Sequence, residues 1–253
     1  MFTIEYRNRV RDRALALAAA DPRVVAGAVV GSMAHSEGDR WSDLDLTFAV
    51  ADDASLRDVL EDWTRSLVSE FDAIQLFDLP AGESIYRVFL LPGCLQFDLS
   101  FTPASAFGAS GPQFRLLFGS SVEKPFPPPP SAHELFGYAT HHALRARFCI
   151  ERGRFWQAEY WISGARDSAL SLACLRHGLP AYHGRGFDAL PNDAQAAFAE
   201  ALVRSLERDD LLRALAVAID GLLREAGQTP ELATIAAHAA PHLRELIREV
   251  AGS

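Results

Sequence analysis

The stretch VVGSMAHSEGDRWSDLDLTFAV, residues 29–50, decides how the first half of this chain folds. An apolar run ends at Gly31-Ser32, and after a gap of ten residues the chain continues with Asp43-Leu44-Asp45. Side chains alternate between the two faces of a strand, so the two carboxylates point the same way. Two negative charges this close cost free energy unless a cation lies between them. The stretch therefore predicts two strands, a turn and a metal site.

A third carboxylate follows in CLQFDLSF, residues 94–101. On a strand, Asp98 shares one face with Gln96 and Ser100, while Leu95, Phe97 and Leu99 share the other. Three aspartates on neighbouring strands can hold two divalent ions about 3.5–4 Å apart. Carboxylate oxygens are the ligands that Mg²⁺ uses together with substrate phosphates. We therefore expect Asp43, Asp45 and Asp98 to bind Mg²⁺, with two ions in the site.

The Gly31-Ser32 pair predicts the partner of such a metal site. Glycine lets the backbone approach a ligand closely, and the N–H groups of the following turn favour phosphate oxygens. The Ser32 hydroxyl adds one more hydrogen-bond donor. We expect this turn to bind a triphosphate beside the three acids.

The pattern VVGS, ten residues, DLDL and a later FDLSF resembles the polymerase-beta-like nucleotidyltransferase superfamily over roughly residues 23–101. The resemblance implies Asp43 and Asp45 as metal ligands, Asp98 as third ligand or base, and Gly31-Ser32 as the triphosphate-binding turn. It also implies ATP or another NTP as co-substrate. Members of this superfamily often carry a basic residue just after the Gly-Ser pair, so Arg40 or a C-terminal arginine is expected to serve here instead.

Hydrophobic periodicity predicts the elements of the first part of the chain. Helices are expected over residues 6–20 and 54–71, with Ser55 as a cap of the second and with the arginines of the first away from its apolar side. Strands are expected over residues 23–30, 43–51, 73–78, 85–91 and 94–101, the last two joined as a hairpin at Pro92-Gly93. Residues 103–131 lack clear periodicity and end in KPFPPPPS, a stiff spacer.

Beyond the proline run the sequence predicts helices over residues 132–151, 153–178, 193–207, 209–227 and 230–250, with a kink or break at Pro241. The expected fold class is therefore α+β. A small mixed-sheet nucleotidyltransferase domain would cover residues 1–125, and an all-α helical-bundle domain would cover residues 132–253. This order looks like the antibiotic nucleotidyltransferases that adenylylate aminoglycosides or lincosamides. The helical domain would then help to close the cleft and bind the acceptor.

One helix of the second part carries a polar stripe. At helical spacing, Glu159, Ser163 and Arg166 lie opposite the apolar positions Ile162 and Ala165. Our hypothesis is that Glu159 binds or deprotonates the acceptor and that Arg166 contacts phosphate.

Composition narrows the class of partner. The formal net charge is −9 and the chain has a single lysine, which disfavours long nucleic acid as a partner. No apolar run reaches the roughly 18 residues of a membrane span, and the first residues lack a signal peptide. Three scattered cysteines predict reduced thiols and a cytoplasmic protein. The apolar helices after residue 193 could pair with another chain, so a homodimer stays open.

The leading hypothesis is an enzyme that moves a nucleoside monophosphate, AMP from ATP in the first instance, to a hydroxyl of a small molecule such as an aminoglycoside-like antibiotic, with release of pyrophosphate. Two alternatives stay open. One is a toxin–antitoxin-type nucleotidyltransferase and helical module acting on protein or RNA, in which Arg176 and His183 would form the reactive pair. The other is a non-catalytic nucleotide-binding module.

Overall fold

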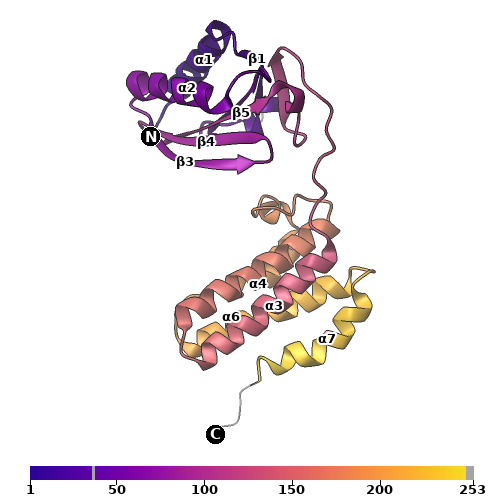
Figure 1. Ribbon diagram of the computed structural model, residues 1–253. Helices are drawn as coiled ribbons and strands as arrows, with labels where there is room; N and C mark the ends of the chain where they lie inside the picture. Colours follow the sequence, from indigo (N-terminus) through magenta and orange to yellow (C-terminus); the bar gives the residue numbers. More distant parts are fainter. Residues whose placement is uncertain (36–37, 249–253) are drawn as a thin grey trace. The chain divides into compact units, whose positions relative to one another are not determined.

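The computed structural model describes residues 1–35 and 38–248. The chain divides into two compact units, Met1–Pro127 and Pro128–Ser253. The first unit combines a mixed sheet with helices and the second is helical (Figure 1). The α+β class expected from the sequence is confirmed.

The first unit is built on one sheet. Among the described residues it has six strands in the order β3-β4-β5-β2-β1-β6. β2 and β5 run parallel, and every other pair of neighbours runs antiparallel. Their bounds are β1 Val24–Val30, β2 Leu44–Val50, β3 Ile74–Ala81, β4 Ser84–Leu91, β5 Leu95–Pro103 and β6 Phe114–Phe118.

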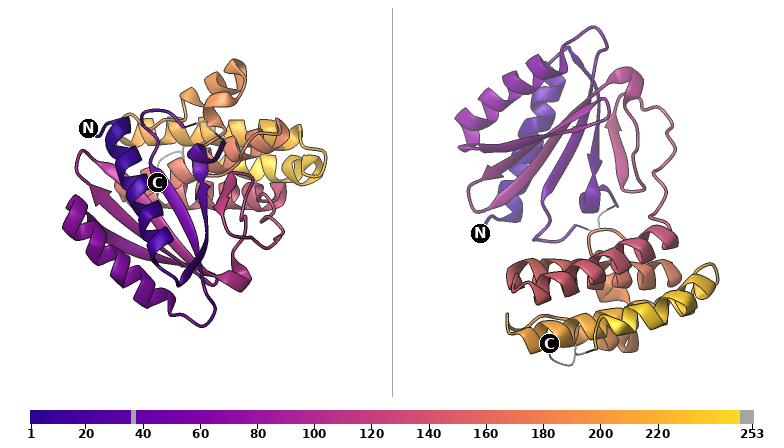
Figure 2. Two further views of the ribbon diagram at one scale, coloured as in Figure 1. Left: turned by 90° about the horizontal axis from the view of Figure 1, so that it is seen from above. Right: turned by 60° about the horizontal axis from the view of Figure 1, so that its bottom comes forward.

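Helices α1 (Ile4–Ala20) and α2 (Leu56–Phe71) lie on the same face of this sheet (Figures 1 and 2). The alternating leucines and phenylalanines of β2 and β5 point toward them and are buried. The ring of Phe48, for example, lies 5.0 Å from that of Trp63 on α2. Because strand side chains alternate, the polar residues of β2 and β5 are directed to the opposite face.

Sequence periodicity missed β6. The stretch FRLLF at Phe114–Phe118 is short and has no polar alternation, so only its antiparallel pairing with β1 identifies it as a strand. A second difference concerns Asp43, which precedes the first residue of β2 instead of lying in the strand. The helix cap predicted at Ser55 is present, since the Ser55 side chain accepts a hydrogen bond from the Asp58 N–H.

The second unit is a bundle whose core combines the apolar stripes of its helices. Ser131 and Glu134 form a capping box at its first helix. The bounds are α3 Ala132–Glu151, α4 Phe155–Arg176, α5 Asn192–Ala199, α6 Arg208–Gly227 and α7 Ala233–Glu245. No helix in the described part of the chain combines the length and the apolar character needed to cross a bilayer.

Two helices of this unit are shorter than the sequence predicts. The helix expected over residues 193–207 ends at Ala199. Arg204 and Ser205 lie outside it, and their backbone N–H groups donate to the Asp210 carboxylate, each at 2.7 Å. Of the helix expected over residues 230–250, α7 covers Ala233–Glu245, and residues 249 and 250 lie outside the described residues. The break expected at Pro241 is absent, because α7 continues through this residue to Glu245.

Arg87 ties the β3–β4 hairpin to α2. It is 2% exposed and donates to Asp78 of β3 at 2.7 Å, and to Thr64 and Glu61 of α2 at 2.8 and 2.9 Å. We expect Arg87→Met to lower the free energy of unfolding by about 3 kcal/mol, because breaking a buried charge network leaves its partners uncompensated. The exposed control Arg65→Met should cost less than about 1 kcal/mol. Urea unfolding measures both, and equal losses would contradict the assignment.

Candidate metal and phosphate site

The register between β2 and β5 brings two of the predicted acids together. Asp45 is the direct cross-strand partner of Asp98, flanked by the pairs Leu44–Phe97 and Leu46–Leu99. Paired residues on neighbouring strands point to the same side of a sheet. Because the flanking apolar pairs face the helices, the two carboxylates lie on the opposite face.

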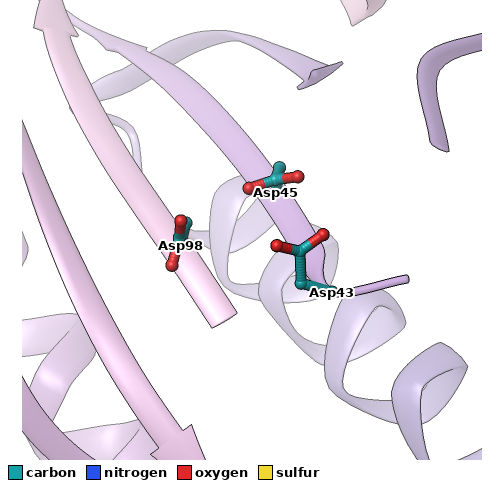
Figure 3. A group of neighbouring side chains, drawn as sticks. All are labelled: Asp43, Asp45 and Asp98. Atoms are coloured by element: carbon teal, nitrogen blue, oxygen red, sulfur yellow. The ribbon is translucent and has the colours of Figure 1, made fainter. Parts of the chain in front are cut away.

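Asp43 completes the group. It lies two residues before Asp45, and carboxylate oxygens of Asp43, Asp45 and Asp98 all lie within 4.8 Å of one another. Figure 3 shows the three carboxyl groups gathered over the adjacent ribbons of β2 and β5. In the described part of the chain, no other group of three or more His, Cys, Asp or Glu residues is arranged to hold a metal ion. Three half-buried carboxylates are hard oxygen donors of the kind that Mg²⁺ takes.

The electrostatics of the group favour a bound cation. Burial raises the pKa of Asp98 above its ordinary value, and the neighbouring negative charge of Asp43 raises this pKa further. Gln96 acts against this shift, because its side-chain amide donates to both Asp98 oxygens at 3.0 and 3.2 Å. The ionised cluster therefore has an electrostatic cost that a divalent cation would offset.

Gly31 lies against the acids. β1 pairs antiparallel with β2, with Val29 opposite Leu46, so the chain leaves β1 beside Asp45. Gly31 starts a 3₁₀ turn over Gly31–His35 with φ of 69°, and a Cβ at this position would collide with the Asp45 carboxylate. Only glycine satisfies both the left-handed backbone and the close approach. The structure thus places the Gly31-Ser32 turn directly beside the predicted metal ligands.

Arg7 holds the segment that leads into Asp43, and sequence periodicity missed it. It is 3% exposed, and one Nη donates to the carbonyl oxygens of Asp39 and Ser42 at 2.8 and 2.7 Å. The expectation that the α1 arginines lie away from its buried side is wrong for this residue. The sequence feature that could have identified Arg7 as buried is its spacing of three and seven residues from Val10 and Ala14, which places the three residues on one side of the helix.

Sequence periodicity also missed a second arginine, Arg115, because it did not identify β6 as a strand. Arg115 lies on this strand opposite Val29, and its Nε donates to the Ala34 carbonyl at 2.9 Å. Ala34 belongs to the same 3₁₀ turn as Gly31 and Ser32. Arg115 is exposed, so it adds a positive charge at the turn for which the sequence offered only Arg40 or a more distant arginine.

Arg40 points toward the start of α1. Its guanidinium carbon lies 4.1 Å from the centroid of the exposed Trp41 ring. It also lines a hollow of about 230 Å³ together with residues 2–5. A contact between Arg40 and a triphosphate stays a prediction.

Glu159 and Arg166 lie on α4 of the helical unit. The Glu159 carboxylate accepts a hydrogen bond from the Ser163 hydroxyl at 2.8 Å, and Arg166 donates to Asp167 from Nε and Nη2 at 2.9 and 2.8 Å. Their roles toward acceptor and phosphate stay predictions.

Arg176, the arginine of the alternative RNA-directed pair, has a structural partner. It donates from Nε and Nη2 to Glu225, which is 1% exposed, at 3.0 and 2.8 Å. This contact joins α4 to α6. His183 follows in a loop with φ of 53°.

Comparisons with known proteins do not identify the family of this chain. No protein-family model and no curated protein matches the sequence. Among solved structures, an aminoglycoside 6-adenyltransferase from Bacillus subtilis is similar over 94% of this chain and 97% of its own, with 11% identity and a TM-score of 0.42. JHP933 from Helicobacter pylori is similar over 93% and 99%, with 13% identity and a TM-score of 0.29. Likeness this weak carries no argument about activity.

We expect the effect of Asp98→Asn on the Tm to differ between EDTA and Mn²⁺. In EDTA at pH 7 the variant should have a higher Tm than the wild type, because the raised pKa means that ionised Asp98 destabilises the folded state. This gain should disappear below pH 3.8, where the carboxyl is protonated in both states. With Mn²⁺ the wild type should gain more than the variant. Asp53→Asn, at an exposed turn, is the control, and a Tm gain for both variants would contradict the expectation.

We expect Arg7→Met to lower the free energy of unfolding by about 2–3 kcal/mol, because two hydrogen bonds from a charged donor are lost. It should also weaken Mn²⁺ binding, since the segment before Asp43 loses its anchor. Arg13→Met on the same helix removes an exposed ion pair with Glu70 and should leave the Mn²⁺ affinity unchanged. Urea unfolding and titration by electron paramagnetic resonance measure the two effects. Wild-type Mn²⁺ affinity in Arg7→Met would show that Asp43 does not depend on this contact.

Proposed function

We propose that this protein is a Mg²⁺-dependent nucleotidyltransferase that moves a nucleoside monophosphate, AMP from ATP, to a hydroxyl of a small molecule and releases pyrophosphate. The observation that carries the proposal is the meeting of three carboxylates within 4.8 Å beside a turn that begins with Gly31. Divalent ions bound there would neutralise the triphosphate and the charge that develops during transfer.

Each group of the site has a role in this proposal. Asp43 and Asp45 would hold the metal from the β2 side, and Asp98 on β5 would serve as third ligand or as base. The backbone N–H groups of the turn and the Ser32 hydroxyl donate to phosphate oxygens. Arg115 binds the Ala34 carbonyl of the same turn and would steady it from the helix side of the sheet, and Arg40 and Arg166 are the candidates for contact with the triphosphate.

Asp98 suits the task of proton acceptor. Burial raises its pKa above the ordinary value, which makes it a better base than an ordinary aspartate. In the step, the acceptor oxygen bonds to the α-phosphorus and its proton passes to Asp98. The bond from the α-phosphorus to the bridging oxygen breaks, and its electron pair leaves with pyrophosphate.

The charge of the chain indicates what kind of acceptor it binds. A chain with one lysine and a net charge of −9 suits a small acceptor better than a long nucleic acid. We assign Glu159 of the helical unit to acceptor binding.

Transfer of labelled nucleotide from ATP to a pooled library of hydroxyl compounds, read by mass, tests the proposal. We expect transfer by the wild type with Mg²⁺, none with EDTA, and a loss of roughly a thousandfold or more in Asp45→Asn. Asp53→Asn should retain activity. Transfer that persists in EDTA or in Asp45→Asn would overturn the mechanism. Binding of Mg²⁺-ATP without transfer to any compound would instead identify a non-catalytic nucleotide-binding module.

A further inference from the structure

We propose that the face of the sheet formed by β3 and β4 beside Asp98 binds the acceptor, and that the acceptor is an uncharged molecule with an apolar or aromatic face next to its reactive hydroxyl. This inference rests on the proposed function and narrows its substrate class. We call this face the β3–β4 surface, and it consists of Ile74, Phe77, Leu79, Tyr86, Val88 and Leu90.

Strand register places this surface next to the acids. Val88 on β4 is the direct partner of Asp98, and Phe77 on β3 is the direct partner of Val88. Partners across a sheet point to the same side, so the row leads from a carboxylate to a valine and a phenylalanine. Two parallel rows flank it, namely Ser100–Tyr86–Leu79 and Gln96–Leu90–Ile74.

The outer part of this surface is apolar and open. Ile74, Phe77 and Leu79 on β3 are 58%, 49% and 52% exposed, whereas Val88 between them and Asp98 is buried. The charged residues of the same two strands, Asp78 and Arg87, bind each other at 2.7 Å, and Arg87 also reaches Glu61 of α2, on the other face. Clustered exposed apolar side chains beside a polar site mark a place where a ligand binds.

The order of strands across the sheet assigns the ligand. The Gly31 turn follows β1, the acids lie on and beside β2 and on β5, and the apolar residues lie on β4 and β3, which are consecutive neighbours in the sheet. In nucleotidyl transfer the attacking and leaving oxygens lie roughly in line on opposite sides of the phosphorus. With the leaving pyrophosphate at the Gly31 turn, the acceptor hydroxyl approaches from the Asp98 side. The rest of the acceptor then lies over β4 and β3.

Charge decides the class of acceptor. A polycationic molecule gains affinity from several carboxylates. None of the six side chains of the β3–β4 surface carries a charge, and Glu159 would supply only one carboxylate to the acceptor. The nearby Asp43, Asp45 and Asp98 would be neutralised by divalent ions. A ring or hydrocarbon face, in contrast, would gain by covering Phe77 and Leu79. The surface therefore favours an uncharged acceptor over a polycationic aminoglycoside.

The test compares two probes on the full chain with Mg²⁺ and α,β-methylene-ATP, by saturation-transfer NMR. One probe is 4-nitrophenyl β-D-glucoside, an uncharged aryl sugar, and the other is the polycation kanamycin. The test variant is Phe77→Thr/Leu79→Thr, since threonine keeps strand propensity while removing the apolar contact area. The control is Val68→Thr, which replaces an exposed apolar side chain by a threonine of nearly equal size. Val68 lies on α2, which covers the other face of the sheet.

We expect saturation transfer to the aryl protons in wild type and in Val68→Thr, and an affinity about tenfold weaker in the double variant. Kanamycin should not displace the aryl glucoside. Absence of the aryl signal in wild type, equal affinity in the double variant, or displacement by kanamycin would each overturn the inference.

Two measurements on the same samples distinguish acceptor binding from dimerisation and from failure of the metal site. Sedimentation that shows a dimer in wild type and a monomer in the double variant would assign the surface to a second copy of the chain and overturn acceptor binding there. Mn²⁺ titration reports on the metal site alone. Absence of Mn²⁺ binding in the wild type would count against the proposed function, whereas normal Mn²⁺ binding without an aryl signal would count only against the β3–β4 surface.

Discussion

The parallel pairing of β2 with β5 is the constraint on which the rest of this structure depends. It aligns Leu46 with Leu99 on the helix side and Asp45 with Asp98 on the other side. A shift of one residue would turn the acids toward the core and the leucines toward solvent. The apolar packing under α1 and α2 therefore fixes the register, and the register in turn fixes the distance between the carboxylates. Core packing and chemistry are coupled through the two-residue period of a strand.

The two faces of the sheet make opposite contributions to stability. The helix-facing side buries the large aromatic and aliphatic residues, including Phe48, Phe97 and Phe101. The other side collects three like charges, which destabilise a fold with no bound cation. A site of this kind exists because packing on the opposite face compensates for it. The concentrated negative charge of Asp43, Asp45 and Asp98 is what makes this cluster suited to a cation.

The helix side also reaches the site directly. Arg7 of α1 binds the backbone on both sides of residues 40 and 41, so a helix on the packed face sets where the chain enters Asp43. Arg87 binds the β3–β4 hairpin to α2 in a comparable way. Two buried arginines thus hold two segments of this sheet, Arg7 the segment before the acid cluster and Arg87 the hairpin that carries the β3–β4 surface. Their long side chains bridge distances that short polar residues could not.

The sequence alone determined the local features. Alternation placed Asp98 among apolar neighbours, and the spacing around Gly31-Ser32 and Asp43-Leu44-Asp45 predicted a metal and phosphate site. The cap at Ser55 and the proline run marked the starts of α2 and α3. Tertiary structure decided the rest, because pairings between distant segments leave no periodic signal. It set Asp45 opposite Asp98, recruited β6 with Arg115, buried Arg7, and aligned Phe77 and Val88 with the acids. Local pattern gives the direction of a side chain along its own strand, but only the packed register determines which side chains it meets.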